Sequence, residues 1–123
     1  MIYDQNNIFA KILRGEIPCD KVYESDHALA FKDINPQAKI HVLVIPKGPY
    51  INMDDFSKNA KPDEIVGLIK ALGETAKIVG VSEHSQGKGY RYIGNNGPDG
   101  GQEVPHLHFH IVGGEKLGRM VSK

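Results

Sequence analysis

The sequence predicts an α+β fold with a mainly antiparallel sheet. Two segments carry apolar residues at helical spacing, one near the N-terminus and one over residues 62–80. Five other segments are short and either alternate in polarity or are rich in β-branched residues, as strands are. In chain order these segments give one helix, three strands, a second helix and two strands. This order is typical of an α+β domain rather than of a parallel sheet, in which strands and helices alternate.

The first helix is predicted within residues 6–18 and is short. Its apolar positions recur at helical intervals before a glycine and a proline end the pattern: Ile8, Phe9, Ile12 and Leu13, then Gly15 and Pro18. Two strands follow at residues 21–25 and 27–34, separated by a tight turn near Ser25 and Asp26.

The second of these strands alternates in a way that assigns its two faces. Leu29, Phe31 and Asp33 point to one side, while Ala28, Ala30 and Lys32 point to the other. Residues 34–39 form a loop. Residues 40–46 are rich in β-branched side chains and end at a proline, which indicates an interior strand.

The longest predicted element is a helix over residues 62–80, after a segment, 47–60, that has turn residues and room for a single helical turn. Pro62 suits the first helical position, and Asp63 and Glu64 suit the positive end of the helix dipole. The expected buried face comprises Ile65, Leu68, Ile69, Leu72, Ala76 and Val79, with Gly80 as the C-terminal cap. A strand at 89–96, a glycine-rich loop at 97–102 and a last strand at 107–112 complete the prediction.

Composition limits the class of protein. The chain has 123 residues, which fits one domain over 1–123, and its 15 Lys and Arg balance 15 Asp and Glu. This balance argues against a nucleic-acid binder or a membrane-surface binder, and no apolar run approaches the ~20 residues of a membrane span. The polar N-terminus lacks a signal-peptide pattern. One cysteine, Cys19, excludes an internal disulfide, so a cytoplasmic protein is expected.

Three histidines stand at alternate positions near the C-terminus. In a strand, His106, His108 and His110 would share one face at intervals of ~6.6–6.8 Å. The intervening apolar residues, Leu107, Phe109 and Ile111, would anchor the strand against the long helix. All three imidazoles are therefore expected to meet one pocket.

This row of histidines allows three interpretations. It could be a solvated polar face, which is the least informative. It could be a metal site completed by Glu103, His41 or His84, because histidines two apart on a strand can share an ion. It could also provide a nucleophile for phosphoryl or nucleotidyl transfer, with the glycine-rich segment 94–102 supplying main-chain amides for phosphate oxygens.

The same residues resemble a known family. "HLHFHIV" is similar to the alternating pattern of the histidine triad (HIT) superfamily. The segments "IFAKILRGEIP", "LAFKDINPQAKIHVLVIPK" and "GYRYIGNNGPDGGQEVPHLHFHIVGG" resemble, in order and spacing, the Hint branch of nucleoside phosphoramidate hydrolases. Together these segments span nearly the entire chain.

The resemblance implies a five-stranded sheet in each subunit of a homodimer, the two sheets joining into one of ten strands. It implies a purine nucleotide site for AMP, GMP or their phosphoramidates. His108 would attack the α-phosphorus of a nucleoside 5′-phosphoramidate and form a nucleotidyl-histidine, which water then hydrolyses. His106 would orient His108 through its main-chain carbonyl. His110 would contact a phosphate oxygen, and His41 would complete the polar cluster.

The resemblance also implies the remaining site residues. Asp33 would accept hydrogen bonds from both ribose hydroxyls, for which a carboxylate has the two acceptors needed. An apolar slot for the base would comprise Ile8, Phe9, Ile12, Phe31 and Ile34, and the phosphate would be surrounded by Asn95, Gly101 and Gln102. Glu103 would stand near the leaving amine, where familiar relatives often carry a small hydroxyl residue. A carboxylate there could receive or deliver a proton, or it could repel the phosphate.

No cofactor and no metal are expected, and the chemical step is expected to be independent of metal. Asparagines occupy the N-terminal region in which some relatives bind structural zinc through cysteines. Two alternatives to phosphoramidate hydrolysis remain. One is another HIT activity, namely dinucleoside polyphosphate hydrolysis or nucleotidyl transfer. The other is a nucleotide-binding interaction protein with incidental turnover.

Overall fold

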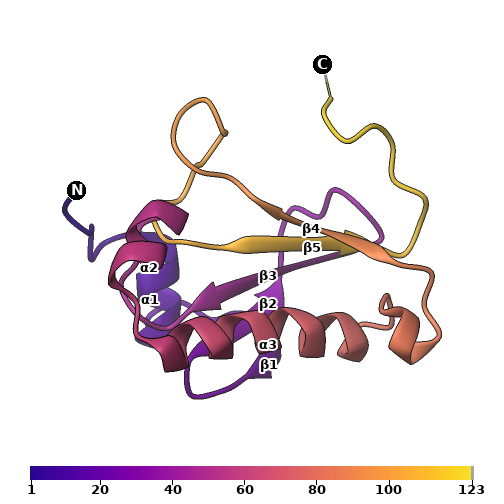
Figure 1. Ribbon diagram of the computed structural model, residues 1–123, viewed down its shortest axis with the longest axis horizontal. Coiled ribbons are helices and arrows are strands. Elements are labelled where there is room, and N and C mark those ends of the chain that lie inside the picture. Colours follow the sequence, from indigo (N-terminus) through magenta and orange to yellow (C-terminus); the bar gives the residue numbers. More distant parts are fainter. Residues whose placement is uncertain (123) are drawn as a thin grey trace.

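The computed structural model describes residues 1–122 and confirms the α+β class. Its five strands are β1 (Lys21–Glu24), β2 (Ala28–Lys32), β3 (Ile40–Pro46), β4 (Tyr90–Gly94) and β5 (Phe109–Gly113). They form one sheet in the order β1-β2-β3-β5-β4, and every neighbouring pair is antiparallel (Figure 1). The last strand in sequence therefore lies between β3 and β4.

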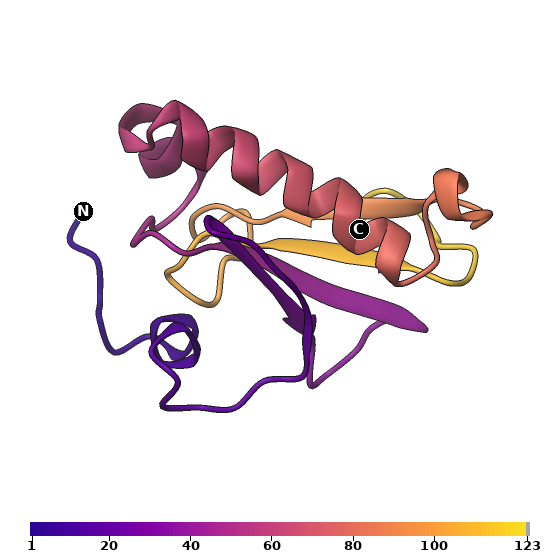
Figure 2. The ribbon, with the colours of Figure 1, turned by 90° about the horizontal axis from the view of Figure 1, so that it is seen from below.

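Helices lie on both faces of the sheet (Figure 2). The long helix α3 (Pro62–Ile78) packs along one face, against β1, β2 and β3. The short helix α1 (Ile8–Leu13) lies on the opposite face, near one end of the sheet. A further helix, α2 (Met53–Asn59), precedes α3, and a 3₁₀ turn, η1 (Glu83–Ser85), follows it. Among residues 1–122, no helix has the length and apolarity needed to span a membrane.

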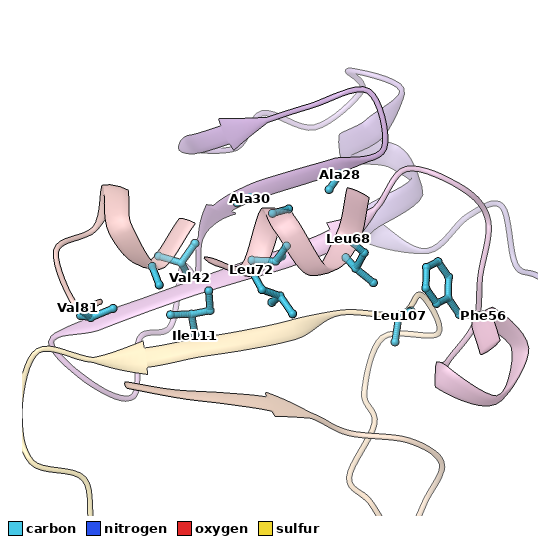
Figure 3. Close-up of a cluster of buried hydrophobic side chains, with 12 residues drawn as sticks. Ala28, Ala30, Val42, Phe56, Leu68, Leu72, Val81, Leu107 and Ile111 are labelled. Carbon is cyan, nitrogen blue, oxygen red and sulfur yellow. The ribbon is translucent and has the colours of Figure 1, made fainter. Parts of the chain in front are cut away.

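The main core lies between α3 and the sheet (Figure 3). Ala28 and Ala30 of β2 face α3, as their alternation predicts, and the small side chains allow the helix to come close to the sheet. Ile111 of β5 and Leu107 just before it also belong to this core, which confirms them as apolar anchors.

A second, smaller apolar cluster lies on the other face of the sheet. It joins Phe9 of α1 to β2 and β3 and comprises Phe9, Leu29, Phe31, Leu43 and Ile45. Alternate residues of β2 and β3 thus point to the α1 side of the sheet rather than to α3. This cluster forms one border of the cavity described below.

The predicted buried face of α3 was partly wrong. Leu68, Leu72 and Ala76 are buried as expected, but Ile65 is 38% exposed and Ile69 is 59% exposed. The helix packs against β1, β2 and β3, and the part of its apolar stripe that carries Ile65 and Ile69 stays exposed. Periodicity identifies an apolar stripe but not how much of that stripe finds a partner within one chain.

The segment before α3 was also underestimated, because α2 has seven residues rather than a single turn. The side chain of Asn52 caps it by accepting the Asp55 backbone N–H at 3.0 Å. Asp54 and Asp55 lie in its first turn, where carboxylates favour the helix dipole. These capping signals are visible in the sequence, but the helix is short and buries only Phe56.

Gly67 of α3 should resist substitution by alanine. A Cβ atom at this position would lie 2.7 Å from the Cβ of His27 in the β1–β2 turn. Alanine normally stabilises a helix interior by about 1 kcal/mol relative to glycine, but here the contact should reverse the sign. We expect Gly67→Ala to lower the free energy of unfolding by about 1–3 kcal/mol, measured by urea denaturation. Combining it with His27→Gly, which removes the opposing Cβ, should recover part of the loss. A stabilised single variant would contradict the close approach.

Candidate active site

A cavity of about 680 Å³ opens on the face of the sheet that α1 partly covers. This volume lies within the usual range for small-molecule sites. Twelve of the fourteen residues assigned to the site from the sequence line it: Ile8, Phe9, Ile12, Phe31, Asp33, Ile34, His41, Asn95, Gly101, Glu103, His108 and His110. The structure thus brings together residues from both ends of the chain.

The position of β5 between β3 and β4 explains why two of the histidines meet. In the antiparallel register His110 lies opposite Leu43, and Val112 lies opposite His41. His41 and His110 therefore point to the same face on neighbouring strands. Their ring nitrogens, Nε2 of His41 and Nδ1 of His110, are 2.9 Å apart.

The expectation that all three imidazoles enter one pocket was wrong for His106. Strand β5 begins only at Phe109, so the two-residue strand repeat does not extend back to His106. The His106 side chain is fully buried and does not line the cavity. Its Nε2 lies 2.9 Å from the main-chain oxygen of Pro46, and its Nδ1 lies 2.5 Å from the hydroxyl of Tyr3. Burial lowers the pKa of His106 to about 4, so the ring is neutral near pH 7.

A main-chain carbonyl determines which ring nitrogen of His108 carries the proton. Its Nδ1 lies 2.7 Å from the carbonyl oxygen of His106, and a carbonyl can only accept, so Nδ1 carries the proton. Burial lowers the pKa of His108, which keeps the ring neutral near pH 7. The lone pair of this neutral imidazole is then on Nε2. The contact to the His106 carbonyl is the one that the family resemblance implies.

The tautomers of His41 and His110 follow from one backbone amide. The N–H of Gln37 donates to Nδ1 of His41 at 3.0 Å, so a neutral His41 carries its proton on Nε2. That proton can be donated to Nδ1 of His110, which leaves the Nε2–H of His110 as a donor. Burial, together with the proximity of the titratable rings of His108 and His41, lowers the pKa of His110 to about 4. His110 is thus a neutral hydrogen-bond donor at the cavity.

Asp33 completes this polar group. One of its carboxylate oxygens accepts the Asn35 N–H at 2.8 Å, and the other lies 3.3 Å from Nε2 of His41. The nearest ligand atoms of Asp33, His41 and His110 all lie within 4.8 Å of one another, a spacing that could hold a metal ion. The hydrogen bonds argue against such a site, because His41 has its lone pair on the nitrogen bound to Gln37 and its proton on the nitrogen that faces the other two residues.

One residue of the glycine-rich loop that was expected at the phosphate does not line the cavity. Asn95, Gly101 and Glu103 line the cavity, but Gln102 does not. The Gln102 side chain instead donates to the carbonyl oxygens of Ile51 at 2.7 Å and Val104 at 3.1 Å, and it accepts the Gly97 N–H at 3.1 Å. Gln102 therefore holds the loop in place. The sequence alone does not distinguish a glutamine that fixes a loop from one that contacts phosphate. His84 lies in η1, outside the cavity lining.

Several residues that line or support the site were missed. Arg91 and Ile93 line the cavity from β4, on the same face as His110. Arg91 also donates to the main-chain oxygens of Gly118 and Arg119, which holds the C-terminal segment beside the cavity. The alternation of β4 indicates that Arg91 and Ile93 share one face of the strand. Only the pairing of β4 with β5 shows that this face is the one that carries His110. Tyr3 had no such signal, since nothing in its local sequence connects it to a histidine 103 residues away.

Comparison with known proteins agrees with this architecture. The HIT domain family model matches residues 14–117. A HIT-like protein of Azospirillum brasilense is 59% identical over 121 residues, which cover 98% of this chain and 96% of the relative. The purine nucleoside phosphoramidase of Escherichia coli K12 is 41% identical over 119 residues, which cover 96% of this chain and 95% of that enzyme. The structure of a HIT family hydrolase from Clostridium thermocellum superposes with a TM-score of 0.84 at 38% identity, covering 97% and 99% of the two chains.

The fold and the site therefore define a small α+β protein whose cavity presents a neutral histidine with a main-chain-fixed tautomer. The family match extends from β1 through β5 and includes the histidine row. The chain belongs to the HIT domain family, as its sequence motifs indicated.

The buried histidine His106 makes stability depend on pH in a defined window. Its pKa is about 4 in the folded protein and near 6.5 in the unfolded chain, so between these values only the unfolded chain takes up the proton. Stability should therefore fall on acidification, by about 2 kcal/mol from His106 between pH 7 and pH 5. His108 and His110, whose pKa values are also lowered, should add to this loss. Carboxylates whose pKa is lowered in the folded protein are protonated at lower pH, so they change stability mainly below this window. Urea denaturation at pH steps between 7 and 5 measures the loss, and His84→Gln, at an exposed site, should leave the slope unchanged. A flat profile would contradict the buried neutral state.

Proposed function

We propose that this protein hydrolyses the P–N bond of purine nucleoside 5′-phosphoramidates, giving a nucleoside monophosphate and an amine. The observation that carries the proposal is the tautomer of His108. Its Nδ1–H is bound to the His106 carbonyl, so its Nε2 lone pair is available at a cavity of nucleotide size. The 41% identity to a purine nucleoside phosphoramidase over 96% of the chain supports the substrate class.

The reaction has two steps. Nε2 of His108 attacks the α-phosphorus, the P–N bond breaks, and the amine leaves with one added proton. The nucleotidyl-histidine that forms is then attacked by water, which restores neutral His108 and releases the monophosphate. Throughout, the His106 carbonyl holds the Nδ1–H and stabilises the positive charge that develops on the imidazole.

The phosphate and the ribose have separate partners. The Nε2–H of His110 donates to a phosphate oxygen, as do main-chain amides of the loop that carries Asn95 and Gly101. Asp33 accepts hydrogen bonds from the ribose hydroxyls. The base lies in an apolar slot at α1 and β2. The slot residues are Ile8, Phe9, Ile12, Phe31 and Ile34, with Leu43 and Val104 beside them.

Glu103 handles the proton of the leaving group. It is an exposed carboxylate that lines the cavity, and its charge acts on His108. In the first step it relays a proton from solvent to the departing nitrogen. In the second it accepts a proton from the attacking water.

The test is hydrolysis of adenosine 5′-phosphoramidate by metal-stripped protein in the presence of a chelator. We expect release of AMP by the wild type and a loss on the order of a thousandfold or more in His108→Ala, because the nucleophile is removed. His84→Ala is the matched control, since His84 is exposed and lies in η1. Steady-state rates from AMP release provide the measurement.

The products separate the alternatives. Fast cleavage of a dinucleoside polyphosphate with slow phosphoramidate cleavage would favour a different HIT activity. Tight AMP binding without turnover in wild-type protein would favour a nucleotide-binding protein instead. Equal rates for wild type and His108→Ala would contradict the assigned nucleophile.

We also propose that the protein forms a homodimer through β4 and the uncovered side of α3. Strand β4 is an edge strand, and Tyr92, on its α3 face, is 64% exposed. Val66 and Ile69 on α3 are 53% and 59% exposed. Pairing of two β4 edges would join two five-stranded sheets into one and cover this apolar surface.

A charge at Ile69 should disrupt this dimer. We expect Ile69→Glu to shift the mass from that of a dimer toward 13.6 kDa in light scattering after size exclusion, because a carboxylate would be buried at the interface. Ile78 is a matched control, as it is similarly exposed at 55%. It follows Ile69 by nine residues and so points to the opposite side of a helix with about 3.6 residues per turn. A wild-type monomer, or equal effects of both variants, would contradict the proposed interface.

A further inference from the structure

We propose that Tyr3 is a positioning residue for the site: its hydroxyl fixes the ring of His106, and His106 in turn holds the carbonyl that orients His108. This inference rests on the proposed function, because it assigns a role in the reaction to a residue outside the cavity. Tyr3 precedes the segment that the family model matches, which begins at residue 14.

The geometry at His106 leaves one arrangement of protons. Nε2 of His106 lies 2.9 Å from the carbonyl oxygen of Pro46, at the end of β3, and must donate to it. A neutral imidazole then has its lone pair on Nδ1, 2.5 Å from the Tyr3 oxygen. The Tyr3 hydroxyl therefore donates, and the ring is held at both nitrogens.

The ring of His106 and the carbonyl that orients His108 belong to the same residue, so their positions are coupled. The carbonyl of His106 accepts the Nδ1–H of His108 at 2.7 Å, so a shift of His106 moves the acceptor that sets the His108 tautomer. Without Tyr3, Nδ1 of His106 would be a buried acceptor with no partner, which is costly. The ring could then flip or tilt, and the peptide that follows it would lose its fixed orientation.

Tyr3 is itself held, although it lies near the chain terminus. Its ring packs edge-on against His106, with centroids 5.6 Å apart. The chain from Tyr3 into α1 is fixed by Asn7, which donates to the Asp4 carbonyl at 2.8 Å and caps the helix by accepting the Ala10 N–H at 2.9 Å. Phe9, two residues further on, packs edge-on against both His106 and His108. The N-terminal segment therefore packs against His106 and His108 and helps to hold both rings.

The test compares Tyr3→Phe with Tyr50→Phe. Both variants remove one hydroxyl that makes a hydrogen bond, since the Tyr50 hydroxyl donates to Glu64 at 2.6 Å, and Tyr50 does not line the cavity. We expect Tyr3→Phe to lower kcat for adenosine 5′-phosphoramidate by about tenfold with KM within about a factor of two, since the loss affects orientation rather than binding. Tyr50→Phe should leave both constants unchanged.

A spectroscopic measurement tests the tautomer independently of turnover. The ¹⁵N signals of His106 should show a protonated Nε2 and a hydrogen-bonded, unprotonated Nδ1 in wild-type protein, and this pattern should change in Tyr3→Phe but not in Tyr50→Phe.

The expected kcat loss together with a changed His106 pattern supports the inference. An unchanged kcat in Tyr3→Phe, with active wild type, overturns it, as do equal losses in both tyrosine variants. Inactive wild-type protein contradicts the proposed function instead. In that case a His106 pattern unaffected by Tyr3→Phe overturns the inference separately.

Discussion

The insertion of β5 between β3 and β4 is the constraint on which the rest of the structure depends. A central strand pairs on both edges, so its register is set twice, against Leu43 on one side and Ile93 on the other for His110. The same strand contributes Ile111 to the core under α3 and His110 to the cavity on the opposite face. A shift of one residue would exchange these faces, which would bury imidazoles against α3 and expose the apolar anchors. Packing and site geometry are therefore coupled.

Main-chain groups set the tautomers of the site. The carbonyl of Pro46 fixes His106, the carbonyl of His106 fixes His108, and the amide of Gln37 fixes His41. Peptide groups do not titrate, so the arrangement does not depend on the charge of a neighbouring carboxylate. Burial works in the same direction, because it lowers the pKa values of the three row histidines and favours their neutral forms. A neutral ring with one fixed proton is what a nitrogen nucleophile and a neutral donor require.

Much of the fold was predictable because local patterns have strong physical causes. The alternation of β2 placed Leu29 and Phe31 opposite Ala28 and Ala30, and both sets are buried where the alternation put them. The helix after Pro62 and the glycine that follows it were also evident from spacing. By contrast, α2 was underestimated because its stability comes from capping and one buried side chain. Exposure of Ile65 and Ile69 depends on which strands the helix packs against, which no local pattern records.

The sequence by itself determined the five strands, the first and the longest helix, their order and the row of histidines, because periodicity and motif spacing are local properties. Only the tertiary structure decided which imidazoles share the cavity. His106 leaves the row because the strand begins at Phe109, and its place is taken by His41 from β3. The partners Pro46 and Tyr3, distant in sequence, likewise became visible only after folding. A hydrogen bond between residues far apart in the chain depends on strand pairing and burial, and neither leaves a periodic signal.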